Sequence, residues 1–250
     1  MSVLDYSTRP VLVITIDTDW SPQACVEDTL NLLREHEAPA TVFTTRGLDP
    51  RVVGDFDIGI HPNFCGPTQS EDAIREELKA CTRALPRATG VRSHALVGSS
   101  RHYLLLRHGF GRLRYTSNYY MPGVPGIAPF MTQSGLPELP IFWMDHLELE
   151  RGAKLETRRL FEQLLTPGLK VFDFHPFHLF INSQSRAHFH SARPSYHNAA
   201  RLRKQRRNGA GVRTMLNSLL QQAEKEGIEL ATCAQIATIA KRQRTTSRVA

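Results

Sequence analysis

Residues 11–17 (VLVITID) restrict the possible folds more than any other part of the sequence. They form a continuous apolar run rich in β-branched residues, which is typical of a strand buried on both faces. The next segment, residues 25–36, has apolar side chains at helical spacing, and residues 40–45 (ATVFTT) are again strand-like. The chain is therefore predicted to begin with a strand, a helix and a second strand.

Strands and helices are predicted to alternate as far as about residue 182. Further strands are expected at residues 57–61, 91–94, 112–117, 139–143 and 170–175, and further helices at residues 70–83, 101–108 and 154–165. This alternation predicts an α/β fold with a parallel sheet, either closed as a barrel or left open. In both cases ligands bind at the carboxyl ends of the strands.

With 250 residues, the chain is long enough for a single α/β catalytic domain. We expect its core at about residues 10–182, with a long Gly- and Pro-rich loop at residues 122–140. Residues 183–211 predict a second long loop, polar and basic, and residues 212–241 predict C-terminal helices at 212–225 and 233–241. Residues 242–250 are expected to be a flexible basic tail.

The charge pattern bears on the choice of partner. The net charge of +7 is concentrated in residues 201–207 and 241–248. Phe and Tyr are not interleaved with the first cluster, as stacking on bases would require, so we expect no nucleic-acid partner. The diphosphate of an activated sugar would explain the cluster as well as RNA would. The basic side chains concerned are Arg201, Arg203, Lys204, Arg206 and Arg207, and a mobile solvated loop is the alternative interpretation.

The sequence also predicts a cytoplasmic location. No transmembrane segment is expected, because no stretch approaches the roughly 20 apolar residues of a membrane helix. Residues 1–10 lack the basic-then-apolar order of a signal peptide. The four cysteines show no paired CxxC spacing, which argues against a zinc knuckle or a redox dithiol.

Asp17 and Asp19 stand at the end of the first predicted strand. Two neighbouring carboxylates repel each other when both are ionised, so such a pair is stable chiefly when a cation or a proton lies between them. A metal ion is the simplest explanation, and a helix cap or an exposed turn is the alternative.

Histidines end three later strands. His61 follows the third strand and His94 follows the fourth, and two imidazoles with one carboxylate would leave an open position on a zinc ion. His175, after the strand at residues 170–175, has the reference pKa of about 6.5 that suits proton donation to a leaving amine. His178 follows closely, but a packing role is the simpler interpretation there.

These strand ends resemble the motifs of a known family. The series TIDTDW, GIHPNF, VRSH, IFWMD and DFHP resembles that of the NodB-homology polysaccharide deacetylases, and GIHPNF looks most like their WbmS-like branch. The resemblance spans about residues 11–181. It implies a distorted (β/α) barrel that uses a divalent metal, usually zinc, to remove acetyl groups from N-acetylated sugars.

The resemblance also implies roles for single residues. Asp17 resembles the catalytic base, Asp19 the metal-binding aspartate and His61 the first histidine of a pair. The second histidine is expected four residues later, where this chain has Cys65. His94 is the preferred substitute, since hydrolytic zinc sites of this type keep oxygen and nitrogen ligands. Cys65 or His178 would take the third position otherwise.

The remaining motifs imply a catalytic acid and a substrate groove. His175 resembles the catalytic acid, and Arg92 resembles a groove arginine that steadies the catalytic aspartate. Trp143 and Asp145 resemble the opposite groove wall, so these two and Arg92 are assigned to substrate binding. A substrate linked to a nucleotide or a lipid and used in surface-polysaccharide assembly would suit a cytoplasmic enzyme.

Two alternatives remain at this point. The missing second histidine and the altered arginine motif would also suit a catalytically inactive fold that binds sugar without hydrolysing it. The basic segments would suit a nucleic-acid-binding protein, which ranks third.

Overall fold

The computed structural model describes residues 4–45, 48–66, 70–155 and 158–247. Its central strand is β1 (Pro10–Asp17), which pairs in parallel with β2 (Ala40–Thr44) and with β9 (Gly168–Phe174). All residues of β1 after Pro10 are buried, which confirms the strand predicted from the apolar run. A third parallel partner, β10 (Glu229–Leu230), was not predicted; it pairs with the start of β1.

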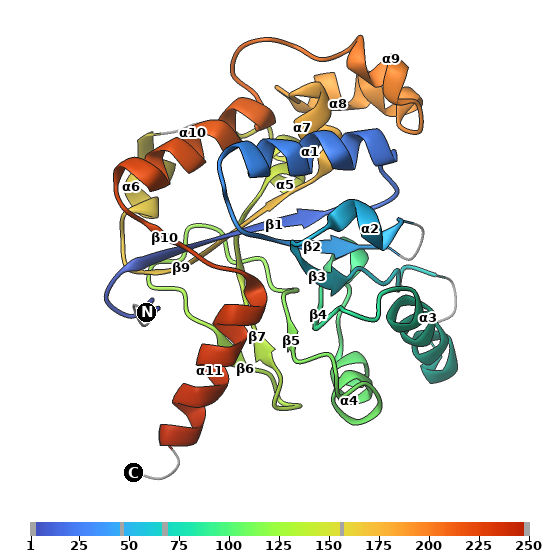
Figure 1. The fold of residues 1–250 in the computed structure, drawn as a ribbon, viewed down its shortest axis with the longest axis vertical. Helices are drawn as coiled ribbons and strands as arrows, with labels where there is room; N and C mark the ends of the chain where they lie inside the picture. Colours follow the sequence, from blue (N-terminus) through green and yellow to red (C-terminus); the bar gives the residue numbers. More distant parts are fainter. Residues whose placement is uncertain (1–3, 46–47, 67–69, 156–157, 248–250) are drawn as a thin grey trace.

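The strands form one strongly curled sheet in the order β6-β7-β5-β4-β3-β2-β1-β9-β8 (Figure 1). The further strands are β3 (Asp57–Ile60), β4 (Gly90–Val91), β5 (Tyr115–Thr116), β6 (Phe130–Met131), β7 (Pro137–Glu138) and β8 (Ile141–Met144). Among the strands that the structure describes, only β6 runs antiparallel to its neighbour. A parallel bridge between Tyr120 and Ile141 draws the two ends of the sheet together. The expected distorted (β/α) barrel is thereby confirmed.

Helices cover the sheet. They are α1 (Gln23–Glu35), α2 (Pro50–Val53), α3 (Glu71–Ala84), α4 (Ser100–Gly109), α5 (Asp145–Glu150), α6 (Arg158–Leu164), α7 (Pro176–Ile181), α8 (Arg186–Ala192), α9 (Ala199–Arg203), α10 (Val212–Lys225) and α11 (Cys233–Ser247). Two 3-10 turns, η1 (His94–Leu96) and η2 (Arg193–Ser195), complete the set. Within the described residues, none of these helices has the length and apolarity needed to cross a bilayer.

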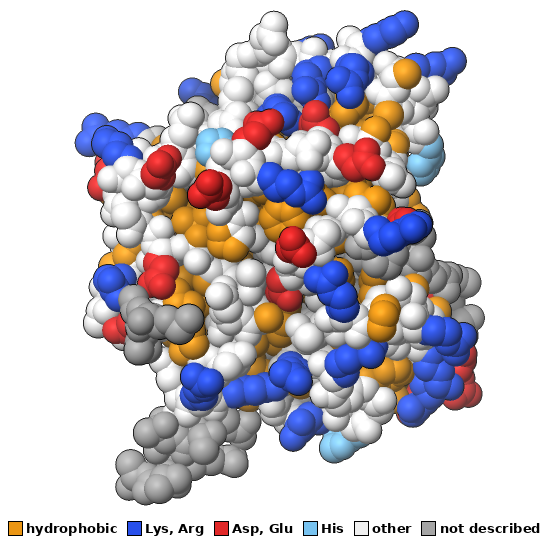
Figure 2. Space-filling view, in the orientation of Figure 1, with side chains coloured by type: hydrophobic (Ala, Val, Ile, Leu, Met, Phe, Trp, Pro, Cys, Tyr) orange, Lys and Arg blue, Asp and Glu red, His pale blue; other side chains and the backbone are white. Residues whose placement is uncertain are grey.

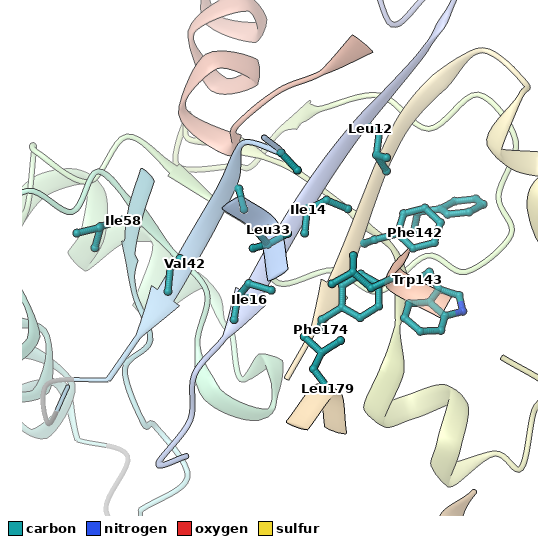
Figure 3. Close-up of a cluster of buried hydrophobic side chains, with 14 of the residues drawn as sticks. Leu12, Ile14, Ile16, Leu33, Val42, Ile58, Phe142, Trp143, Phe174 and Leu179 are labelled. Atoms are coloured by element: carbon teal, nitrogen blue, oxygen red, sulfur yellow. The ribbon is translucent and has the colours of Figure 1, made fainter. Parts of the chain in front are cut away.

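The two faces of β1 pack into different cores. Leu12, Ile14 and Ile16 point outward, toward the helical layer that contains α1 (Figure 3). Val11 and Val13 point into the barrel, where Ile236 of α11 packs with them. The inward face continues to Thr15 and Asp17, so the same alternation that fills the barrel delivers a carboxylate to its carboxyl end.

The C-terminal third differs from the sequence-based prediction. Residues 183–211 were expected to be a loop, but they contain α8, η2 and α9. Their few apolar side chains, among them Phe189 and Leu202, are buried against Phe177 and Phe180 of α7. The basic tail is also corrected, because α11 continues to Ser247; residues 248–250 lie outside the described part.

Two smaller predictions also need correction. The helix expected at residues 154–165 is shorter, since residues 154 and 155 are not helical and α6 ends at Leu164; residues 156–157 lie outside the described part. The loop at residues 122–140 contains the short strands β6 and β7. Such short strands have too few residues to leave a periodic pattern.

Candidate active site

Six polar side chains meet at the carboxyl end of the barrel. They come from the ends of five strands: Asp17 ends β1 and Asp19 follows it, His61 follows β3, His94 follows β4, Asp145 follows β8 and His175 follows β9. Parallel strands all end on the same rim, so residues far apart in sequence become neighbours there. The structure thus brings together the predicted base, acid and metal ligands.

Asp19, His61 and His94 form the tightest cluster. One carboxylate oxygen of Asp19 lies 3.1 Å from His61 Nε2 and 2.9 Å from His94 Nδ1. One potential ligand atom from each of the three residues lies within 4.8 Å of the other two. One carboxylate and two imidazoles are a usual protein ligand set for catalytic zinc, so these residues fit the metal that the motifs implied.

Local electrostatics favour a charged Asp19. Burial raises the pKa of this carboxyl, but hydrogen bonds from His61 and His94 and the charge of His175 lower it below its ordinary value. Burial likewise lowers the pKa of His61, whereas Asp17 and Asp19 raise it, and the net shift is upward. A site with this much negative charge attracts either a proton or a metal cation.

The backbone around these ligands is strained. Asp19 has a φ of 46°, and Ala95 and Leu96, directly after His94, have φ values of 54° and 55°. Residues with a side chain rarely adopt this left-handed region, and each such residue costs about 1–3 kcal/mol. The surrounding fold therefore imposes on Asp19 and on the residues after His94 a backbone conformation that a relaxed chain would not adopt.

Asp17 is held by the fully buried Arg92. The Arg92 Nη1 atom donates to Asp17 Oδ1 at 3.0 Å and to Thr15 Oγ1 at 2.6 Å, and it also contacts Asp173. The guanidinium is further fixed by Ser117, whose backbone oxygen lies 2.9 Å from Nε. Burial raises the pKa of Asp173 above its ordinary value, and the charge of Arg92 opposes this shift.

His175 is oriented by Asp145. The Nδ1 atom of His175 lies 2.6 Å from Asp145 Oδ1, and the backbone N–H of His175 donates to Asp145 Oδ2 at 2.8 Å. Burial lowers the pKa of His175, but the charge of Asp145 raises it well above its ordinary value. Nε2 lies 3.9 Å from Asp19, so this nitrogen faces the cluster. A protonated imidazole in this position can give up a proton at the site.

The three residues assigned to substrate binding are corrected. Arg92 and Asp145 have no exposed surface, and their polar atoms are engaged with Asp17 and His175 respectively. Trp143 is 5% exposed and packs in the hydrophobic core, with ring centroids 5.2 Å from Phe174 (Figure 3). Arg92 and Asp145 therefore position Asp17 and His175, while Trp143 packs in the core behind β8.

Cys65 and His178, the two alternative third ligands, lie near the Asp19, His61 and His94 cluster but are not part of it. Cys65 is exposed, and its Sγ atom lies 4.0 Å from the backbone oxygen of His94. His178 is buried between Ser183, whose hydroxyl is 2.9 Å from Nδ1, and His146, whose Nδ1 is 3.3 Å from Nε2. Burial lowers the pKa of His178 to about 3, which agrees with a neutral packing histidine. The preference for His94 over both stands as a prediction.

Two adjoining cavities open above the cluster. The inner one, of about 430 Å³, contains Asp17, Asp19 and His175. The outer one, of about 700 Å³, shares part of its wall with the inner one. The shared wall is formed by Asp19, His94, His146, Phe189, Arg193 and Tyr196.

Sequence reasoning missed four of the six residues of this shared wall, for identifiable reasons. His146 directly follows Asp145 at a predicted strand end, so its position did carry a signal. Phe189, Arg193 and Tyr196 carried none. They belong to the polar segment after residue 182, where no strand end marks a position at the site.

Comparisons with known proteins agree with this geometry. The family model described as WbmS-like polysaccharide deacetylase matches residues 14–193. A Bordetella bronchiseptica protein, provisionally assigned as a polysaccharide deacetylase involved in O-antigen biosynthesis, is 28% identical over 84% of this chain and 90% of its own, with a TM-score of 0.75. No curated protein matches the chain significantly.

More distant structures share the fold. A provisionally assigned polysaccharide deacetylase from Mycobacterium smegmatis is 17% identical, with a TM-score of 0.64 over 98% of this chain and 94% of its own. A mutant of a Bacillus anthracis CE4 family pseudoenzyme, described as having restored enzymatic activity, is 14% identical, with a TM-score of 0.51 over 92% of this chain and 68% of its own.

Proposed function

Because this chain belongs to the WbmS-like polysaccharide deacetylase family, we propose that it is a metal-dependent hydrolase that removes the acetyl group from an N-acetylated sugar. One observation carries the proposal. Asp19, His61 and His94 converge beside Asp17 and His175 at the floor of an open cavity. Hydrolysis of an amide needs an activated water, a base and an acid, and this cluster offers a residue for each requirement.

Asp19, His61 and His94 would hold a divalent ion, zinc in the first instance. When bound, such an ion polarises the acetamide carbonyl and lowers the pKa of the attacking water. The strained backbone at Asp19 and beyond His94 fixes two of these ligands before any ion arrives. A fixed ligand set lowers the entropy cost of metal binding.

Asp17 is the general base of the proposed reaction. Its carboxylate accepts a proton from water as the water oxygen forms a bond to the acetyl carbon. Arg92 donates to the other side of the same carboxylate, at 3.0 Å, so the base is held in one orientation. Because Arg92 is buried and fixed by Ser117, it holds Asp17 without reaching the substrate.

His175 is the general acid. The C–N bond breaks as Nε2 of His175 donates its proton to the departing amine nitrogen, which gives acetate and a free amino sugar. Asp145 accepts a hydrogen bond from Nδ1 and so leaves the proton on Nε2 directed toward the cluster. Exchange with solvent then removes the proton from Asp17 and restores the one on His175.

The substrate is proposed to be a nucleotide-linked or lipid-linked N-acetyl sugar of surface-polysaccharide assembly. The relative from Bordetella bronchiseptica, with its stated part in O-antigen biosynthesis, supports this choice. We place the reaction in the cytoplasm, because activated sugars of this kind are made there.

Metal analysis combined with acetate release tests the function. Purified protein should contain about one equivalent of a divalent metal, and chelation should abolish acetate release from at least one member of a panel of N-acetyl sugars. Bound metal without acetate release from any substrate would favour the second candidate, a sugar-binding protein that does not hydrolyse. Cys65, at the position where the family resemblance implied a second histidine, is the observation that favours this candidate.

A further inference from the structure

The outer cavity has a chemical character of its own. It lies above the proposed metal ligands, since Asp19 and His94 form part of its floor, and the rest of its wall comes mainly from η2 and its flanking residues. With a volume of about 700 Å³ it is large enough for a group well beyond one acetamide. The reaction proposed above uses only the inner cavity, so the outer one has no role yet.

Two arginines in this wall carry uncompensated charge. Arg193 lines both cavities and Arg201 lines the outer one. Neither has an ion-pair partner within the part of the chain that the structure describes. Of the two acids in the same wall, Asp19 is hydrogen-bonded to His61 and His94, and Glu150 pairs with Arg186 at 2.9 Å and lies 3.3 Å from His190. The outer cavity therefore offers net positive charge to a ligand.

An exposed aromatic ring lies between this charge and the metal ligands. Trp20 is 45% exposed, lines the outer cavity and contacts His94 edge to face, with ring centroids 4.9 Å apart. An indole presented to solvent beside a polar cleft is a stacking surface for a sugar ring or a base.

The wall is held in place before a ligand binds. Tyr196 stacks on Phe177 of α7 at 4.7 Å, and its hydroxyl lies 3.2 Å from that of Ser21, next to Trp20. Arg206 donates two hydrogen bonds of 3.0 Å to Asp28 of α1. Arg206 is thus engaged in fixing the wall. Of residues 201–207, which were expected to bind an anion, Arg201 lines the cavity, and Arg193, which lies outside this range, lines it as well.

Lysine and arginine side chains gather over this end of the molecule. Figure 2 shows several of them above α1, where Figure 1 places α8 and α9. The surface around the outer cavity would therefore attract an anion before it reaches the two arginines.

We propose that the outer cavity is a diphosphate-binding subsite, in which Arg193 and Arg201 hold the diphosphate of an activated N-acetyl sugar and Trp20 stacks on an adjacent ring. The assignment rests on the proposed function, because the acetamide must reach Asp17 and the metal ligands in the inner cavity. Arginine suits a diphosphate, since its planar guanidinium donates to two phosphate oxygens at once. The substrate class is thereby a sugar diphosphate, whether its far end is a nucleoside or a lipid.

Binding can be measured without catalysis, through Trp20 itself. The chain has two tryptophans, and only Trp20 is exposed, so acrylamide quenching of fluorescence reports chiefly on Trp20. Three probes are compared on the full-length protein: uridine diphosphate N-acetylglucosamine, a short-chain prenyl diphosphate N-acetylglucosamine and the neutral methyl glycoside of N-acetylglucosamine. We expect at least one of the two diphosphate probes to protect Trp20 from quenching, and the neutral glycoside at equal concentration to give no protection. The diphosphate probe that binds more tightly shows whether the group beyond the diphosphate is a nucleoside or a lipid.

Variants assign the effect to the two arginines. Arg193→Ala and Arg201→Ala should each raise the dissociation constant of the better diphosphate probe about tenfold and leave that of the neutral glycoside unchanged. Lys204→Ala is the matched control, because it removes a positive charge from the end of α9 outside the cavity wall. Equal weakening by Lys204→Ala, or unchanged binding in both arginine variants, would overturn the assignment.

The outcome separates this assignment from the proposed reaction. Arginine-dependent binding of the diphosphate probes, without acetate release, would support the subsite and refute the hydrolase. Acetate release with the same Michaelis constant for charged and neutral sugars, in wild type and in both arginine variants, would support the hydrolase and refute the subsite.

Discussion

Asp17 and Asp19 are separated by one residue, yet they face different partners. Asp17 contacts Arg92, while Asp19 contacts His61 and His94. Asp17→Asn should therefore retain the metal and lower turnover at least about 100-fold, because an amide cannot accept the proton from water. Asp19→Asn should lose metal, because a neutral oxygen replaces an anionic ligand, and added metal should partly restore activity.

Metal content and turnover of the two variants are measured side by side. Each variant is the control for the other, since both exchange a carboxylate for an amide of the same shape. If Asp17→Asn loses the metal while Asp19→Asn retains it, the two roles are reversed.

Asp145 acts through His175, and the pH profile should reveal this. Burial lowers the pKa of His175 but Asp145 raises it, so the acid stays protonated to higher pH than an ordinary histidine. Activity falls as the pH rises through this pKa, because the deprotonated imidazole has no proton to give. Asp145→Asn should lower the pKa and move this alkaline fall to lower pH, with a drop in turnover of about 100-fold at its optimum.

The comparison is with His175→Ala, which should abolish the alkaline limb altogether. A profile for Asp145→Asn that is lower in amplitude but unmoved along the pH axis would mean that Asp145 only supports the local fold.

At the scale of elements, the wall formed by α8, η2 and α9 depends on a charged anchor. Asp28 of α1 accepts hydrogen bonds from Arg206 at 3.0 Å and from Arg213 at 2.5 Å, and all three side chains are less than a third exposed. Asp28→Asn leaves both arginines without their anion. It should lower the free energy of unfolding by about 2 kcal/mol and speed proteolytic cleavage between residues 183 and 211.

A surface pair supplies the control for this anchor. Glu162 pairs with Arg158 at 2.7 Å, but the two side chains are 59% and 93% exposed. Glu162→Gln should change the free energy of unfolding by well under about 1 kcal/mol. Denaturant unfolding and limited proteolysis should separate the two variants; equal behaviour would show that the wall does not depend on Asp28.

At the scale of the whole molecule, an aromatic layer fills the barrel beneath the site. Phe43 lies over Gly59 of the next strand and Tyr115 lies over Gly90, so a Cβ atom at either glycine would come within 2.0–2.3 Å of a ring carbon. The guanidinium of Arg92 rests on Phe43, 4.4 Å from its centre. The two glycines thus make room for the layer that supports Arg92 and, through it, Asp17.

Gly90→Ala should therefore destabilise the protein by about 1–3 kcal/mol, because Tyr115 must move in a packed interior. Gly111→Ala is the control, since a Cβ atom there meets nothing within 4 Å. Thermal unfolding of both variants checks the prediction. If the Gly90→Ala protein is as stable as the Gly111→Ala protein, Tyr115 can move without cost and the aromatic layer is not tightly packed.

The sequence alone determined the elements whose physics is local. A buried parallel strand needs apolar residues on both faces, so residues 11–17 were sufficient to predict β1. Because parallel strands end on one rim, Asp19, His61 and His94 could be predicted to form one site. Apolar spacing predicted α10 as Val212–Lys225, its observed bounds. The resemblance of the strand-end motifs then supplied the family and the distorted barrel, both now confirmed.

Only the tertiary structure decided what depends on contacts between distant segments. The segment after residue 182 is polar because most of it faces solvent. Its helices are stabilised by a few apolar side chains that pack on α7. So few apolar residues leave no periodic pattern in the sequence from which these helices could be predicted. Trp143 and Asp145 looked alike as groove residues. Trp143 lies within β8 and packs in the core, whereas Asp145 begins α5, where the strand has ended, and contacts His175. Likewise, the sequence shows eight lysine and arginine residues between positions 186 and 213, but only folding decides which of them pair with acids and which, as with Arg193 and Arg201, have no acidic partner among the described residues.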